Sequence, residues 1–515
     1  MLQLSLPPID SNPAIAPETK PSKVKAWLDL QMQQHVTVEA ARVVGDALAA
    51  TNRVAMSDSR RLEIAELYWS TANTLWPLLE QQFVRASQPL TGVALDAAKA
   101  ALTLATEMSV AYKHLLLHES QRRLLLTGPR LLLALVHRCL QCTARILVNS
   151  YLAYAPVPPK TWLDAHAVYA FARERHLNQL TVQAETPDMT PERAYLQTLL
   201  LALANPYGFV PGQLALVAQY LQQHCQLAKL TDVPPVHRMA KAVAIAPVGH
   251  DFPPFSANKG GAVEGSKIYL LTYDLAFQIQ EQLRSLDGGA PPPPEIGRDA
   301  AARGQYVLLL RRLLRQWAIP PARQFNRLPS RARVVMCTGM SGVWHYSRGD
   351  HDAGAPAPAK LPPMSACQVI NHTPAGYALR QIDGHHASVR IGDLLALRVE
   401  DRPGLQVGMV RWFRNTFKGS GLEFGCELLS DAPEAAAAVA EHASASSLAP
   451  VVVLPEEHAP GGVENAPAQI IVPAGVFQLE QAVSLRRGEN SGFAVLTKLV
   501  EQGPGFELYE YVAVP

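Results

Sequence analysis

The hydrophobic periodicity changes along the chain, and this change limits the fold more than any other feature. Up to about residue 230, apolar residues recur every three to four positions, as they do on the buried face of a helix. From residue 333 the apolar residues instead form short runs separated by turn residues, a pattern typical of antiparallel strands. The 515 residues therefore divide into a helical part and a β part, and a chain of this length is expected to hold about three domains.

The first part is expected to be an irregular helical bundle, because no repeat of fixed period is visible. Residues 1–22 contain five prolines and no hydrophobic period, which predicts a flexible tail before a helical domain at 23–232. Thr190 precedes Pro191 and Glu192, an arrangement typical of a capped helix start. The expected helices are 58–85, 95–118, 130–151, 161–177, 191–203 and 211–227.

Residues 233–297 read as a mixed segment that ends in a linker rich in glycine and proline at 288–294. It contains two expected strands, 241–248 and 268–273, and a helix at 274–286 that Asp274 would cap. Residues 298–432 are expected to form an antiparallel β-barrel preceded by a helix at 302–317. An Ala/Ser-rich stretch at 433–449 predicts a short helix and a linker, and 450–515 predicts a C-terminal β extension. The fold class is thus multidomain α + β.

Composition argues against several classes of protein. The formal net charge is +2, so no global field favours nucleic acid or a membrane surface. The six cysteines do not form a disulfide pattern, and the N-terminus lacks the features of a secretory signal. The most apolar stretch contains His137, Arg138 and Arg145, which predicts a buried helix and no membrane insertion. We therefore expect a cytoplasmic protein that binds no nucleic acid.

A local positive field stands out in this nearly neutral chain. Residues 304–334 contain no Asp or Glu. The arginines of this stretch are Arg311, Arg312, Arg315, Arg323, Arg327, Arg331 and Arg333. Arginine grips phosphate with two parallel hydrogen bonds, pairs with the edge of guanine and stacks on base faces. Two readings of the stretch follow: a solvated basic face with a basic loop, and an anion-binding loop, for which arginine is better suited than lysine.

An ordered set of motifs surrounds these arginines. Arg323 and Arg327 form an RxxxR pattern that precedes an expected strand at 334–337. The sequence VINHTPAGYAL follows at 369–379, then a Gly-Asp turn at 392–393, GMVRW at 408–412 and LEFGCE at 422–427. In this order the motifs resemble a PilZ domain, in which an RxxxR loop precedes a [D/N]xSxxG strand and a closing run of barrel strands. The resemblance covers about a fifth of the chain.

The resemblance implies a receptor for cyclic di-GMP, with no further cofactor and no metal. Arg323 and Arg327 would contact phosphate and guanine, Asn371 would read the guanine edge, and Thr373 and Gly376 would complete the second motif. Thr373 replaces the usual serine, and a long insertion separates the two motifs. Arg327 and Arg331 form a second RxxxR, so Arg331 and Arg333 are secondary candidates.

Other readings of the sequence stay open. A PilZ-shaped scaffold that no longer binds nucleotide is the main alternative, and an enzyme is disfavoured because no convergent catalytic set is visible. The Cys139–Cys142 pair and the His114–His118 pair lack the further ligands of a metal site. An unidentified protein partner would bind the N-terminal helical region. Ligand stoichiometry stays open, and nothing selects among motility, polysaccharide production and biofilm formation.

Overall fold

In the computed structural model, the chain forms two compact units. The model describes residues 2–10, 16–121, 129–182, 189–235, 242–257, 264–297, 300–318, 325–348, 363–382, 388–415, 422–440, 448–456, 467–488 and 490–514. The helical unit comprises Met1–Ala86 and Leu90–Arg323. The barrel unit comprises Ser87–Pro89 and Gln324–Pro515.

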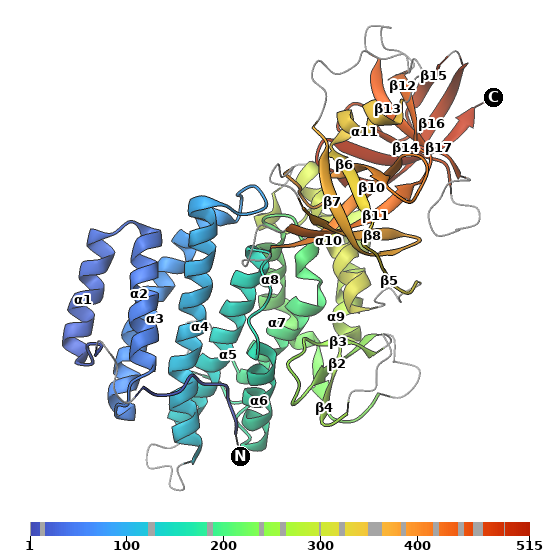
Figure 1. Ribbon diagram of the computed structural model, residues 1–515. Helices are drawn as coiled ribbons and strands as arrows, with labels where there is room; N and C mark the ends of the chain where they lie inside the picture. Colours follow the sequence, from blue (N-terminus) through green and yellow to red (C-terminus); the bar gives the residue numbers. More distant parts are fainter. Residues whose placement is uncertain are drawn as a thin grey trace. The chain divides into compact units, whose positions relative to one another are not determined.

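The helical unit is built on an irregular bundle, as expected (Figure 1). Its helices are α1 (Pro21–Gln34), α2 (Thr37–Asn52), α3 (Asp58–Phe83), α4 (Gly92–Gln121), α5 (Pro129–Leu152), α6 (Thr161–Glu174), α7 (Pro191–Leu203) and α8 (Gln213–His224). Large aromatic side chains fill its core, and the buried indole of Trp76 donates a hydrogen bond to the Ala101 carbonyl oxygen. The helix start at Thr190 is confirmed, because its side chain accepts a hydrogen bond from the Arg193 amide.

The N-terminal segment differs from the expected flexible tail. Leu2 is buried, the Ser5 amide donates to the Asp164 carboxylate at 2.9 Å, and the Asp10 amide donates to the Arg53 carbonyl oxygen. Asp164 also pairs with Lys113 at 2.8 Å between largely buried side chains. These contacts fix residues 2–10 along the bundle, which their proline content and lack of period did not reveal.

A small antiparallel sheet and two helices complete the helical unit. The strands are β1 (Lys229–Thr231), β2 (Val243–Pro247), β3 (Phe255–Ser256) and β4 (Lys267–Leu271), in the order β1-β4-β2-β3. The helices are α9 (Tyr273–Asp287) and α10 (Ala300–Trp317). Asp274 lies inside the first turn of α9 and pairs with Lys229, so it is not the predicted cap.

Helix α10 belongs to the helical unit, although the sequence grouped it with the barrel. The indole of Trp317 is buried and donates to the Leu200 carbonyl oxygen at 3.0 Å. Arg312 donates to the carbonyl oxygens of Asn205 and Gly208. Part of the arginine-rich stretch therefore binds carbonyl oxygens of the helical bundle.

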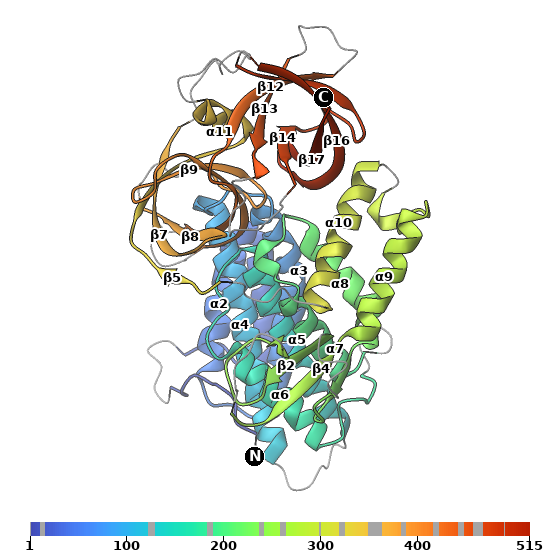
Figure 2. The ribbon, with the colours of Figure 1, turned by 90° about the vertical axis from the view of Figure 1, so that its right-hand side faces the viewer.

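The first barrel is closed by six antiparallel strands (Figure 2). Its strands are β6 (Arg333–Thr338), β7 (Ser365–Thr373), β8 (Gly376–Gln381), β9 (Leu394–Val399), β10 (Gln406–Asn415) and β11 (Leu422–Ser430). They pair in the ring β7-β6-β9-β10-β11-β8, which closes through β7 and β8, and the short β5 (Leu328–Pro329) pairs with β7. This confirms the expected PilZ-like antiparallel barrel.

The C-terminal β extension is a second closed barrel of six strands. Its strands are β12 (Glu434–Ala440), β13 (Ala449–Leu454), β14 (Gln469–Pro473), β15 (Ala482–Arg487), β16 (Asn490–Gly503) and β17 (Phe506–Val514). Residues 434–440 were expected to be a short helix and linker, and this expectation was wrong. Alanine favours helix, but here β12 pairs with both β13 and β15, so tertiary context overrides propensity.

The alanines of β12 lie between two hydrophobic cores. Ala436 and Ala438 face the interior of the second barrel, whereas Ala437 faces a core shared with the first barrel. A strand buried on both faces at such an interface favours small side chains. The unusual composition of this segment is therefore explained by packing.

A short helix, α11 (Met340–Ser347), fills the space between the barrels. Trp344 is buried there and its indole donates to the Ala436 carbonyl oxygen at 2.8 Å. On the neighbouring strands, Arg411 pairs with Glu427 of the first barrel at 2.6 Å and with Glu501 of the second at 2.7 Å. The two barrels thus share one continuous interface.

Helix α5 is the one helix among the described residues that is long and apolar enough to cross a membrane, and most of its apolar window is buried in the bundle. It carries Cys139 and Cys142. All six cysteines are buried and free, and burial raises the pKa of the Cys139 thiol to about 12.

Candidate ligand-binding site

The second motif forms the tight hairpin between β7 and β8. Asn371 pairs with Ala378, and Thr373 pairs with Gly376 across the turn. The Thr373 hydroxyl accepts a hydrogen bond from the Ala375 amide at 3.2 Å, which stabilises the turn. Threonine can replace serine here because the contact uses only the hydroxyl oxygen.

Gly376 is required by the close approach of a neighbouring strand. A Cβ atom at this position would lie 2.2 Å from the Cys426 carbonyl oxygen of β11. Its φ angle is not in the left-handed region. The glycine is therefore needed for close backbone approach, and the approaching backbone belongs to the barrel itself.

The short strand β5 brings the arginine loop beside this motif. Pro329 pairs with Asn371, and Leu328 pairs with His372. Arg327 is exposed and directly precedes this pairing, so the backbone of the RxxxR loop borders the second motif. Arg323 lies outside the described residues.

The outer face beside Asn371 has a floor of small residues. Asn371, Ala378, Gly425 and Trp412 are in register across β7, β8, β11 and β10. Residues in register share one face of a sheet. A Cβ at Gly425 would lie 2.0 Å from the indole nitrogen of Trp412, so the indole packs directly on this glycine. The face therefore offers a flat surface that ends in an aromatic ring.

A charged row runs parallel to this floor on the same outer face. Arg380 and Arg414 flank Glu423 in register, with nitrogen–oxygen distances of 2.7 and 3.0 Å. Burial raises the pKa of Glu423, but the hydrogen bonds from Arg380 and Arg414 outweigh it and leave the pKa below its usual value. The carboxylate is thereby held charged between two guanidinium groups.

The other face of the motif leads to the barrel mouth. The ring of His372 lies 3.5 Å from a guanidinium nitrogen of Arg402, which also lies over the Tyr377 ring. The Tyr377 hydroxyl donates to Gln406 at 2.8 Å, and burial raises its pKa. Arg402 comes from the β9–β10 turn and was not among the residues predicted from sequence.

The two secondary candidates are also on the surface of the barrel unit. Arg331 and Arg333 are both exposed, and Arg333 begins β6 in register with Gln368 of β7. Within the described residues, no group of three His, Cys, Asp or Glu side chains could hold a metal ion.

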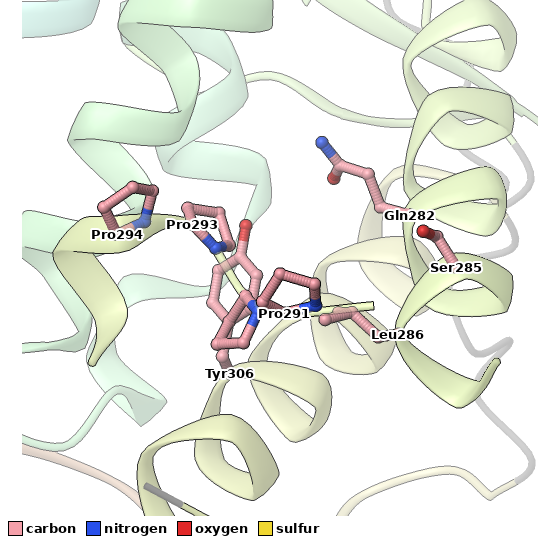
Figure 3. A pocket seen from close by; sticks show the side chains of 8 residues that line it. Gln282, Ser285, Leu286, Pro291, Pro293, Pro294 and Tyr306 are labelled. Carbon is pink, nitrogen blue, oxygen red and sulfur yellow. The ribbon is translucent and has the colours of Figure 1, made fainter. Parts of the chain in front are cut away.

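A cavity of about 670 Å³ lies elsewhere, inside the helical unit (Figure 3). Its lining includes Pro291, Pro293, Pro294, Leu286 and Tyr306. Gln282 and Ser285 of α9 supply polar groups at its edge. Its walls carry no charged side chain among the residues that line it, so it does not resemble a site for a dianion.

Comparison with known proteins agrees with this architecture. Residues 348–436 match the family described as the middle PilZ domain of the cyclic-di-GMP receptor FimW. The chain carries a PilZ domain. Residues 22–235 match the N-terminal domain of the same receptor, and residues 435–514 match its C-terminal β-barrel domain.

One curated relative matches almost the whole chain. It is the cyclic-di-GMP receptor FimW of Pseudomonas aeruginosa, 23% identical over 570 aligned residues that cover 96% of this chain and 90% of the relative. None of the matched descriptions names an enzyme. The match to the PilZ domain begins at residue 348, so it includes Asn371, Thr373 and Gly376 but not Arg323 or Arg327.

Sequence reasoning found the motif residues but missed their neighbours on the sheet. Trp412 and Glu423 lie inside motifs that were noticed only as barrel strands. Arg380 and Arg414 belong to no motif. Cross-strand register is what places Trp412 in the row of Asn371 and the other three side chains in the neighbouring row, and a single sequence gives no direct measure of register.

Proposed function

We propose that this protein is a cytoplasmic receptor for cyclic di-GMP, which binds the outer face of the PilZ barrel between the β5 loop and the β7–β8 hairpin. The observation that carries the proposal is the pairing of β5 with β7, because Pro329, two residues after Arg327, is in register with Asn371. The PilZ match and the receptor among the relatives supply the ligand class.

The chemistry of the face suits a dianion with two guanines. Arg323 and Arg327 would contact phosphate and guanine, since a guanidinium gives two parallel hydrogen bonds to either group. Asn371 has an amide that can pair with a base edge. Ala378 leaves room for a flat ring, and Trp412, whose indole covers Gly425, offers an aromatic surface on which a base can stack.

The function proposed is binding and not catalysis. Cyclic di-GMP would be a signal, and the helical unit would carry the output to a protein partner that the sequence does not identify. A PilZ-shaped scaffold without nucleotide binding remains the competing function. The exposed Arg327, which directly precedes the pairing of β5 with the second motif, favours the receptor.

Isothermal titration calorimetry on the full chain tests the proposal. We expect cyclic di-GMP to bind the wild type, and Arg327→Ala to weaken binding about tenfold or more, because a charge-assisted hydrogen bond contributes about 1.5–3 kcal/mol. Arg398→Ala is a matched control, because Arg398 is exposed on β9 of the same barrel.

Specificity provides the second half of the test. Cyclic di-AMP should compete poorly, since Asn371 and the arginines would read guanine edges. Equal affinity of the wild type and the Arg323→Ala/Arg327→Ala variant, or equal competition by both dinucleotides, would contradict the assigned site. Absence of binding would favour the scaffold.

A further inference from the structure

A cluster outside the PilZ motifs holds two arginines on one carboxylate. Arg380 donates from Nε and Nη2 to Oε1 of Glu423, at 3.2 and 2.7 Å. Arg414 donates from Nη2 to Oε2 of the same carboxylate at 3.0 Å. Each carboxylate oxygen therefore fixes one guanidinium group, which limits the side-chain motion of both arginines.

Exposure differs sharply within this cluster. The Glu423 side chain is 10% exposed, whereas the side chains of Arg380 and Arg414 are 49% and 46% exposed. The carboxylate is thus covered and the guanidinium groups reach the surface. A guanidinium has five N–H donors, and Glu423 uses two from Arg380 and one from Arg414.

The charges of the cluster do not balance. Two arginines and one glutamate leave one net positive charge on a small area. An ion pair that only joined strands would need one arginine for one carboxylate, and exposed pairs of that kind contribute little stability. The excess charge and the fixed geometry are what a phosphate-binding site requires.

The cluster is adjacent to the floor of the proposed site. Arg380 is two residues from Ala378 on β8, and Glu423 is two residues from Gly425 on β11. Side chains two residues apart lie on the same face and are about 7 Å apart along a strand. Arg414 is likewise two residues from Trp412 on β10. A ligand that covers Ala378 and stacks on the Trp412 indole is therefore within reach of both guanidinium groups.

We propose that Arg380 and Arg414, held in place by Glu423, form a second phosphate-binding pair that takes one phosphate of a cyclic dinucleotide whose other half lies at Arg327 and Asn371. The inference rests on the proposed function, because it names further residues of the same face. It assigns Glu423 the role of positioning the two arginines and not of contacting the ligand.

Calorimetry with cyclic di-GMP on the full chain tests this assignment. We expect Arg380→Gln and Arg414→Gln each to weaken binding about tenfold, the effect of losing one charge-assisted phosphate contact. Arg398→Gln removes the same charge from the outer face of β9 and should leave affinity unchanged. Arg380→Lys keeps the charge but not the fork, and should recover part of the loss.

The outcomes separate this inference from the proposed function. If the wild type binds and Arg327→Ala weakens binding, but Arg380→Gln and Arg414→Gln behave like Arg398→Gln, the second pair is refuted and the receptor stands. If the wild type does not bind, both proposals fall. If Arg380→Gln unfolds at a much lower temperature than Arg398→Gln, Arg380→Lys and Arg414→Gln decide. Partial recovery of affinity in Arg380→Lys, together with the expected loss in Arg414→Gln, supports the phosphate contact. Wild-type affinity in both variants refutes the pair.

Discussion

At the scale of single residues, Glu423 shows how a nearly covered carboxylate stays charged. Burial alone would raise its pKa, but two guanidinium groups stabilise the ionised form and lower it. In the lone surface pair of Glu434 with Arg487, at 3.5 Å, the carboxylate side chain is 52% exposed, against 10% for Glu423. Glu423 and Glu434 thus provide a covered and an exposed carboxylate that can be compared within the barrel unit.

This arrangement predicts a pH-dependent contribution to stability. The folded pKa of Glu423 lies below its unfolded value, so its pairing stabilises the fold above the unfolded pKa, about 4.3, and this stability is lost as pH falls through the folded pKa. We expect Glu423→Gln to lower the free energy of unfolding by about 1 kcal/mol at pH 7, a modest value because solvent screens the half-exposed arginines. The difference should shrink below about pH 4.

Urea unfolding of the wild type and of Glu423→Gln across pH 3–7 measures the difference in their free energies of unfolding. Glu434→Gln is the control, and it should change stability little at any pH because its pair is exposed. A Glu423→Gln effect of the same size at pH 3 and pH 7 would show that packing, and not charge, carries the contribution.

Single residues also mark the limit of sequence reasoning. Asn371, Thr373 and Gly376 were predicted as ligand-binding residues because a motif keeps them at fixed spacing along one hairpin. Arg380 and Arg414 were not found, because they lie 34 positions apart in the sequence and meet only through Glu423 on an intervening strand. Their relation depends on the register of three strands.

At the scale of elements, the β7–β8 hairpin depends on contact between backbones. Gly376 is in register with Glu427, and β11 approaches it so closely that no side chain fits. The sequence correctly predicted strands β6 to β11 because their apolar runs are separated by turn residues. It missed β12 because the sequence of that strand, EAAAAVA, consists of alanine and glutamate except for one valine. Both residue types favour helix.

Gly376→Ala should therefore destabilise the barrel even without ligand. The added Cβ would lie 2.2 Å from a backbone oxygen that cannot rotate away, and overpacking of this kind costs about 1–3 kcal/mol. Thermal unfolding of the ligand-free protein measures the effect. Gly492→Ala is the control, because a Cβ at Gly492 meets nothing within 4 Å; equal melting temperatures for the two variants would contradict the proposed role of Gly376.

At the scale of the whole molecule, the two barrels of the barrel unit share one hydrophobic core and form a single structural domain. One hydrophobic cluster takes Leu394, Val407 and Met409 from the first barrel and Val452 and Ile471 from the second. At the edge of the same interface, a Cβ on Gly392 would lie 3.1 Å from Pro504. The sequence predicted two β regions but not their shared core. The sequence of a strand can show that both of its faces are apolar, but it does not show which element packs against each face.

This shared core predicts that the two barrels unfold together. Trp344 is fully buried between them and bonds to the Ala436 carbonyl oxygen, so Trp344→Ala leaves a cavity and an unpaired acceptor, at a cost of about 3–5 kcal/mol. Hydrogen exchange should then accelerate by a similar factor in β9 and in β13, since opening one barrel exposes the core of the other. Trp317→Ala, which removes a buried indole of the helical unit, should instead accelerate exchange around α7 and α10. If Trp344→Ala speeds exchange in β9 while β13 keeps wild-type protection, the barrels are independent folding units, and a ligand on the PilZ face could not act on the second barrel through this interface.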